Sequence, residues 1–312
     1  MRVFVAGAAG AIGSPLVAAL IRRGHEVIGT TRSAERARGL EAAGVRPAVV
    51  DALDREAVQA AVAEAEPDVI VHELTAIPTE FSPRRFDHAF GQTNRLRTEG
   101  TDHLIAAAGA AGVRRFVTQS FAAWAYARKG SSVKTEDDPL DDDPLPQVRR
   151  TLDAIRYLER ATLDGPFDGL VLRYGWFYGP GSTLSRTGSI ADAVRRRRFP
   201  IVGSGGGVWS FIHLVDAAEA TAIAVERGEP GIYNVTDDDP AAVRDWLPLF
   251  AGAIGAPPPR RVPLWLGRVF GGPLGVTMMT ELRGASNTKA RRAFGWELRY
   301  PSWRLGFRDG LG

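Results

Sequence analysis

Short apolar runs alternate with longer amphipathic segments through the first half of the chain. The apolar runs predict strands at residues 3–6, 26–29, 48–50, 69–71, 116–118 and 170–172. The segments between them predict helices at residues 12–23, 34–43, 55–65, 98–109 and 151–163. Buried parallel strands have continuous apolar runs, and alternating strands and helices form parallel crossovers. The pattern therefore predicts an α/β fold built on a doubly wound parallel sheet.

A glycine triplet joins the first strand to the first helix. Gly7, Gly10 and Gly13 are separated by small or apolar residues, which include Ala9, Ala11 and Ile12. Glycines at such a turn let the backbone approach a pyrophosphate, and the following helix directs free N–H groups at it. We therefore expect a cradle for the phosphates of a dinucleotide.

Basic residues follow the second strand, where an NAD-preferring fold offers an acid to the ribose. Thr31 and Arg32 come after this strand, and Arg36 lies one helical turn further on. A guanidinium pairs with a phosphate in a planar fork, so these residues favour NADP(H), with NAD(H) left open.

The third predicted strand ends in an acid. We expect Asp51, followed by Ala52, to lie beside the adenine, where Asp51 accepts a hydrogen bond from the amino group. Asp54 is the better candidate for the N-cap of the next helix.

Composition narrows the class of protein. The 312 residues include 39 Lys and Arg and 36 Asp and Glu, so the net charge is only +3. The one dense basic cluster, Arg195–Arg198, is typical of a solvated helix end or a subunit contact. We therefore expect no nucleic-acid partner. Cysteine is absent, which excludes disulfides and thiolate ligands, and no metal site is predicted. Without a signal peptide or long apolar span we expect a cytoplasmic protein with no membrane partner, and a homodimer is the default assembly.

Several motifs along the chain resemble those of one enzyme family. They are Gly7–Gly13, His72–Ala76, Gly100-Thr101, Gly112–Val117, Arg173 with Tyr178-Gly179-Pro180, Phe211–Asp216, Tyr233–Val235, and Lys289 with Phe294–Trp296. The chain resembles an extended or atypical short-chain dehydrogenase/reductase of the NAD-dependent epimerase/dehydratase type. The resemblance implies a Rossmann domain at 1–180, to which 209–230 return, and a mainly substrate-binding lobe at 181–312, supplied largely from Gly231 onward.

The resemblance also implies positions around the cofactor. Leu74, Thr75 and Ala76 would pass beside it, and the segment from Tyr174 to Tyr178 would border the nicotinamide.

The catalytic helix departs from the family pattern. The family carries a Tyr and, four residues on, a Lys that lowers the phenol pKa. Anchoring the helix on Glu159 puts Thr151 and Ile155 at these two positions. Ser120 matches the family's substrate-binding Ser or Thr and is the leading catalytic candidate.

Tyr126 is the second candidate, and it offers a phenol from the loop after the fifth strand. Its alternative role is that of an aromatic residue that packs against the substrate lobe.

Aromatic residues bound the substrate. The resemblance implies that Trp124, Trp176, Phe177 and Trp209 surround the cleft, whereas Trp246, Trp265, Trp296 and Trp303 are expected to pack in the C-terminal part. His213 also falls at the cleft, and we interpret it as a structural histidine ahead of a general base. Trp209 replaces the arginine of sugar-nucleotide enzymes, so a hydrophobic or aromatic carbonyl, alcohol or enone is the expected small-molecule substrate.

Two classes of function remain open. One is an NADP-dependent oxidoreductase with non-standard catalytic residues, in which orientation drives hydride transfer. The other is a protein that binds the dinucleotide as a sensor, or that performs non-redox chemistry such as isomerisation or dehydration.

Overall fold

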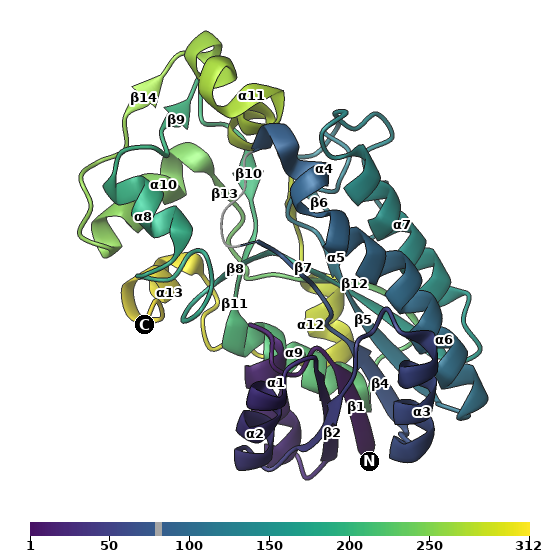
Figure 1. Ribbon diagram of the computed structural model, residues 1–312. Helices are drawn as coiled ribbons and strands as arrows, with labels where there is room; N and C mark the ends of the chain where they lie inside the picture. Colours follow the sequence, from purple (N-terminus) through teal and green to yellow (C-terminus); the bar gives the residue numbers. More distant parts are fainter. Residues whose placement is uncertain (79–82) are drawn as a thin grey trace.

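A twisted sheet of parallel strands organises the protein. The computed structural model describes residues 1–78 and 83–312. The strand order in the sheet is β12-β7-β5-β4-β1-β2-β3 (Figure 1). The strands are β1 (Arg2–Ala6), β2 (Glu26–Thr31), β3 (Arg46–Val49), β4 (Val69–His72), β5 (Arg115–Phe121), β7 (Asp168–Tyr174) and β12 (Gly231–Val235). The direction of winding reverses between β1 and β4, which confirms the doubly wound fold and is where such sheets bind ligands.

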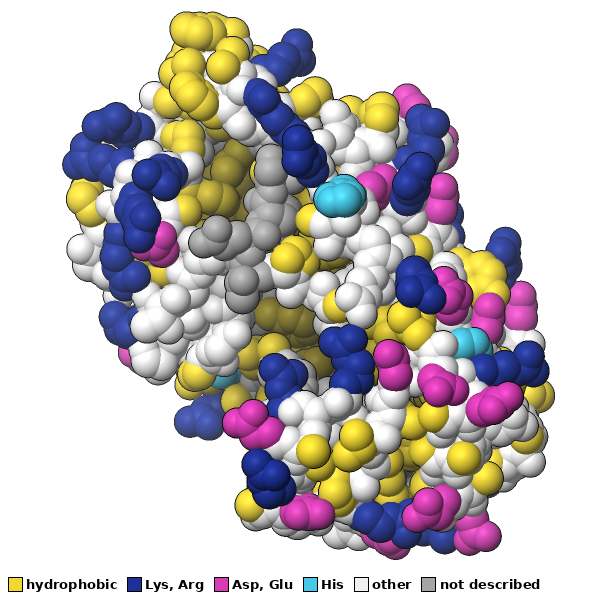
Figure 2. Space-filling view, in the orientation of Figure 1, with side chains coloured by type: hydrophobic (Ala, Val, Ile, Leu, Met, Phe, Trp, Pro, Cys, Tyr) yellow, Lys and Arg dark blue, Asp and Glu magenta, His cyan; other side chains and the backbone are white. Residues whose placement is uncertain are grey.

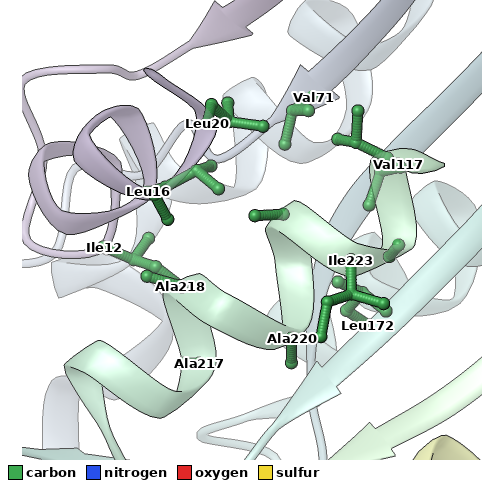
Figure 3. Packing of buried hydrophobic residues seen from close by; sticks show 14 of the residues in the cluster. Ile12, Leu16, Leu20, Val71, Val117, Leu172, Ala217, Ala218, Ala220 and Ile223 are labelled. Carbon is green, nitrogen blue, oxygen red and sulfur yellow. The ribbon is translucent and has the colours of Figure 1, made fainter. Parts of the chain in front are cut away.

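Helices cover both faces of this sheet. On one face lie α1 (Gly13–Arg22), α2 (Ala34–Ala42) and α9 (Leu214–Glu226), and on the other lie α3 (Arg55–Ala65), α6 (Thr101–Ala110) and α7 (Arg149–Leu163). Figure 3 shows Leu16 and Leu20 of α1 and Ile223 of α9 in one cluster with Val71 and Val117 of the sheet. This packing fixes the N-terminus of α1 at the reversal point.

A smaller lobe stands beyond the carboxyl ends of the strands (Figure 1). Its elements are α8 (Ser189–Arg195), β9 (Ile201–Val202), β10 (Val208–Trp209), β13 (Ala241–Ala242), α10 (Val243–Ala253), β14 (Arg261–Val262), α11 (Leu264–Thr280) and α13 (Trp303–Asp309). Its core contains Trp209, Phe211, Trp246, Phe250 and Trp303, all buried.

Short elements connect the two parts. They are η1 (Pro83–Arg85), α4 (Phe86–Ala89), α5 (Gly91–Arg95), the π-helical turn η2 (Leu96–Gly100), β6 (Val133–Lys134), β8 (Trp176–Tyr178), β11 (Phe211–His213), β15 (Gly284–Ala285) and α12 (Thr288–Phe294). β8 and β11 pair in parallel, which holds residues 211–213 beside the end of β7. No helix in residues 1–78 and 83–312 has the length and apolar character needed to cross a bilayer.

The expected elements are present, with ends shifted by a few residues. The Asp54 side chain accepts a hydrogen bond from the Ala57 N–H, so it caps α3 as predicted. The expected allocation of the chain after Gly231 needs correction, because β12 pairs with β7 and α12 packs on β12. Val235 of β12 and Phe294 of α12 are buried in the core of the main sheet. Burial of their apolar side chains favours this position for the two segments. Trp265 does not pack as expected and is 67% exposed.

Candidate functional site: a dinucleotide groove beside an aromatic cluster

The glycine loop is too tight to carry side chains. Gly7 has φ +96°, and its carbonyl accepts a hydrogen bond from the Gly10 N–H at 2.9 Å. A Cβ atom on Gly13 would lie 2.2 Å from the Gly7 carbonyl oxygen. Helix α1 starts at Gly13 without a side-chain cap. In its first turn the Ser14 N–H donates to the Gly10 carbonyl oxygen and Pro15 has no N–H, so the Gly13 N–H is the group left for a ligand. The loop therefore fits the phosphates of a dinucleotide.

The surface of the loop is formed by small residues. Gly10 and Ala11 are exposed and Ala9 is half-buried, whereas Ile12 points into the core. The Gly7 N–H donates to the Thr30 hydroxyl at 3.0 Å, which ties the loop to the end of β2.

The end of β2 presents two cations. Arg32 and Arg36 are exposed, and neither forms an ion pair with a carboxylate of the described residues. Thr31 is buried, and the Ser33 side chain caps α2. The two guanidinium groups are therefore available to an anion at this end of the groove.

The end of β3 places the adenine candidates. Asp51 is exposed and its carboxylate accepts a hydrogen bond from the Leu53 N–H at 3.0 Å. Ala52 is buried, and its carbonyl oxygen lies 3.0 Å from Nδ1 of His103. Asp51 thus has one local partner and remains open to solvent.

Residues 74–76 form the far wall of the groove. The Leu74 carbonyl accepts a hydrogen bond from the Gln119 amide at 2.9 Å. The Ala76 N–H donates to the Thr93 hydroxyl at 3.0 Å, and Thr75 is exposed between them. These bonds hold the backbone after β4 against β5 and α5.

The two catalytic candidates lie in one buried polar network. Ser120 is 2% exposed, and its hydroxyl donates to Oε1 of Glu159 at 2.6 Å. The Tyr126 hydroxyl donates to Oδ1 of Asn234 at 2.7 Å and accepts from Arg173 at 3.0 Å. Burial raises the pKa of the Tyr126 phenol.

Ser120 and Tyr126 both contact a buried ion pair. Arg173 donates to both carboxylate oxygens of Glu159, each at 2.7 Å, inside the protein. A buried ion pair needs its remaining lone pairs and hydrogens satisfied. Ser120 serves Glu159 and Tyr126 serves Arg173, so both hydroxyls have partners inside the protein, and their catalytic role stays a prediction.

The positions assigned to the family's Tyr and Lys carry no acid or base. The Thr151 hydroxyl donates to Oδ1 of Asp87 at 2.6 Å and is buried. Ile155, one turn further along α7, belongs to the apolar cluster that also contains Phe90 and Trp124. The position of the family's Lys is therefore apolar, whereas the position of its Tyr holds a buried hydroxyl bonded to Asp87.

Aromatic side chains continue this apolar surface. Trp176 is half-buried, stacks on Trp209 with ring centroids 4.3 Å apart, and meets Phe121 edge to face at 5.4 Å. Trp124 lies 6.1 Å from Phe121. Figure 2 shows the face between the lobes hollowed, with hydrophobic side chains lining the hollow. Phe121 was not among the sequence candidates, although it ends β5 directly after Ser120.

The other substrate candidates differ in exposure. Trp209 is 2% exposed, and its indole N–H donates to the Met278 carbonyl, so it supports Trp176 from behind. Phe177 is half-buried and lies 5.2 Å from the ring of Tyr174. His213 caps α9 through Nδ1, its Nε2 lies 3.0 Å from the Gly310 carbonyl oxygen, and burial lowers its pKa. Both ring nitrogens are occupied, as a structural histidine requires.

Sequence reasoning missed Glu73. Its carboxyl is buried, and Oε1 lies 2.8 Å from the hydroxyl of Tyr174. The sequence signal that could have indicated it is an acid placed directly after the apolar strand β4.

Comparisons with known proteins define the class. The model of the NAD-dependent epimerase/dehydratase family matches residues 3–236, and the chain belongs to this family. A 3-diazoavenalumate denitrifying reductase of a Streptomyces species is 47% identical, with 100% of this chain and 99% of that protein covered. A 4-hydroxy-2-methyl-3-oxo-4-farnesyl-3,4-dihydroquinoline-1-oxide ketoreductase of Stigmatella aurantiaca is 30% identical, covering 80% and 72%.

Solved structures agree on the fold. The UDP-glucose 4-epimerase of Thermus thermophilus in complex with NAD has a TM-score of 0.74 and 25% identity, covering 100% of this chain and 98% of that one. A human epimerase-family protein with NADPH has a TM-score of 0.75 and 20% identity, covering 100% and 99%. The protein is thus an oxidoreductase-like enzyme of a nicotinamide-dependent family, whose fold neighbours bind NAD and NADPH.

Proposed function

We propose that the protein is an NADP-dependent reductase that removes the diazo group of a small aromatic compound. The observation that carries the proposal is that the position of the family's Lys holds Ile155, a buried member of the apolar cluster that also contains Phe90 and Trp124. The name of the Streptomyces relative supports the proposal, because the similarity to that protein extends over 100% of this chain.

The chemistry of an arenediazonium suits such a site. A reduced nicotinamide supplies a hydride when it is bound. The C–N bond breaks and its electron pair leaves with N₂, while hydride and the ring carbon form the new C–H bond. No oxygen anion develops and no proton is consumed, so the reaction has no need of the Tyr and Lys that a carbonyl reductase uses.

The residues of this chain have three tasks in the proposed reaction. The glycine loop and the N-terminus of α1 would hold the pyrophosphate, and Arg32 and Arg36 would pair with a 2′-phosphate. The half-buried faces of Trp176 and Phe121 would stack on the substrate ring and attract its cationic diazonium group. An apolar wall also keeps water from the carbon that accepts the hydride.

A labelling experiment tests the proposal. Stable arenediazonium salts are incubated with the protein and NADPH that is deuterated at one face of C4, and N₂ and arene are quantified. We expect equal amounts of N₂, arene and NADP⁺, deuterium at the former C–N carbon from one cofactor face only, and no deuterium there when the solvent is D₂O. The Gly13→Ala variant controls for direct reduction by NADPH. Equal rates with and without protein would refute the proposal.

Carbonyl reduction is the second candidate, because the Stigmatella relative is named a ketoreductase. Apolar ketones and enones would then be turned over, with solvent deuterium found on the new hydroxyl group and cofactor deuterium on carbon. Binding of NADPH without turnover of either substrate class would instead favour the sensor or non-redox role.

A further inference from the structure

A buried carboxyl group lies next to the glycine loop. Glu73 directly follows β4 and is 4% exposed, and its N–H donates to the Ala6 carbonyl at 2.8 Å. Its own carbonyl oxygen lies 2.9 Å from the point where a Cβ on Gly7 would stand. The residue is therefore in contact with the floor of the predicted pyrophosphate cradle.

The side chain begins a chain of three short hydrogen bonds. Oε1 of Glu73 lies 2.8 Å from the Tyr174 hydroxyl, which lies 2.6 Å from the hydroxyl of Thr221 in α9. The Thr221 hydroxyl donates to the Ala217 carbonyl at 2.7 Å. The second carboxyl oxygen, Oε2, is buried and has no protein partner in the described residues.

Counting hydrogens along this chain gives the state of the acid. Three contacts require three hydrogens, and the two hydroxyl groups supply only two. If Tyr174 donates to Oε1 of Glu73 and Thr221 donates to Ala217, the 2.6 Å contact between the two hydroxyl groups has no hydrogen. A hydrogen on the carboxyl group lets Tyr174 donate to Thr221 instead, so that all three contacts are hydrogen bonds. Glu73 is accordingly a neutral acid, and burial raises its pKa to about 8 in agreement with this count.

Within residues 1–78 and 83–312, no cation offsets a charge on the Glu73 carboxyl group. Tyr174 of β7 is the titratable group that faces the carboxyl, and α1 packs there with apolar residues such as Ile12, which Figure 3 shows beside Ala218 of α9. The acids of α9 face elsewhere: Asp216 accepts from the backbone of Arg299 and Tyr300, and Glu219 and Glu226 pair with Arg23.

We propose that Glu73 is a positioning residue that has to remain protonated for the dinucleotide to bind tightly. Its ionised form would put a buried negative charge under the loop that receives the pyrophosphate anion. It would also draw the Tyr174 hydrogen away from Thr221 and so disturb Tyr174, whose ring lies beside Phe177. The inference rests on the proposed cofactor and is independent of the proposed substrate.

Binding measured against pH tests the proposal. The Kd of NADPH is determined by fluorescence from pH 7 to 9.5 for the wild type, Glu73→Gln and Glu136→Gln. Glu136 is the matched control, because burial also raises its pKa but its carboxylate accepts from the Asn234 N–H, on β12. We expect wild type and Glu136→Gln to lose affinity about tenfold over this range, and Glu73→Gln to bind as tightly as wild type at pH 7 and to change less than twofold.

A second readout needs no cofactor. The infrared difference spectrum between wild type and Glu73→Gln should contain a protonated-carboxyl band at pH 7 that disappears above pH 8. A wild-type Kd independent of pH, a Glu73→Gln profile that follows wild type, or the absence of that band would each overturn the inference. Tight pH-dependent binding without turnover of diazonium salts would leave it standing and refute the proposed function.

Discussion

Glu159 and Arg173 face each other as a two-pronged ion pair inside the protein, with both nitrogen–oxygen distances at 2.7 Å. Glu159 comes from α7 and Arg173 from β7, and both side chains are almost fully buried. Ser120 completes one end of the pair and Tyr126 the other. The pair therefore joins α7 to the sheet directly below the proposed site.

Removing one partner of this pair should be costly. Arg173→Met leaves the Glu159 carboxylate buried without its cation, and we expect the free energy of unfolding to fall by about 3–5 kcal/mol. Urea unfolding measures the loss. Arg196→Met is the control, since the Arg196–Asp192 pair is exposed and contributes about 0–1 kcal/mol. Equal losses in the two variants would contradict a structural role for the buried pair.

Ser120→Ala separates a structural role from a catalytic one. The hydroxyl donates to a buried carboxylate, so its removal should lower the free energy of unfolding by roughly 1.5–3 kcal/mol. We expect kcat to change less than about threefold, because the hydroxyl is buried and already donates to Glu159. A loss of kcat by a hundredfold with unchanged stability would restore the catalytic assignment.

Gly13→Ala should abolish dinucleotide binding, because its Cβ would lie 2.2 Å from the Gly7 carbonyl oxygen. The loop must open to accept it, and the phosphate-binding N–H groups then move. Calorimetric titration with NADPH checks this. Gly39→Ala in α2 is the matched control: nothing lies within 4 Å of its Cβ, so binding should be retained and stability should rise by about 0.5–1 kcal/mol.

Arg32→Asp should reverse the cofactor preference. An acid at the end of β2 accepts hydrogen bonds from ribose hydroxyls and repels a 2′-phosphate. We expect the Kd of NADPH to rise at least about tenfold, equivalent to about 1.4 kcal/mol, with that of NADH unchanged or lower. Arg38→Asp, at an exposed position of α2, should alter neither Kd. Equal binding of the two dinucleotides by the wild type would refute the NADP preference.

His72 should make the protein sensitive to acid. Burial lowers the pKa of its imidazole to about 4, from 6.5, and its Nδ1 accepts from the Leu74 N–H. Between pH 6.5 and 4 the unfolded chain therefore binds more protons than the folded protein, so stability falls as the pH falls through this window. The full loss is about 3 kcal/mol. His72→Asn keeps an acceptor without titrating, and its unfolding free energy should depend less on pH between 6.5 and 4 than that of wild type.

The order of apolar runs was enough to predict β1 to β5, β7 and the helices α1, α2, α3, α6 and α7 around them, and the glycine spacing predicts the dinucleotide cradle. These features depend on neighbours in sequence: periodicity reports which face of an element is buried, and a tight turn needs glycines at fixed separations. The allocation of β12 to the main sheet was missed, because an apolar strand has the same pattern in either lobe.

The partners of the buried polar groups were decided by the tertiary structure alone. Ser120 meets Glu159 from 39 residues away, and Tyr126 meets Asn234 from 108 residues away. The family pattern places Ser120 near a substrate, but it does not indicate that Glu159 accepts the hydrogen bond of its hydroxyl. The sequence likewise contains Glu73 as an acid in an apolar run, whereas its neutral state follows from a hydrogen-bond chain through Tyr174 and Thr221. A buried hydrogen bond depends on which residues are close in space. Residues far apart in the sequence become close only after the strands have paired in the sheet.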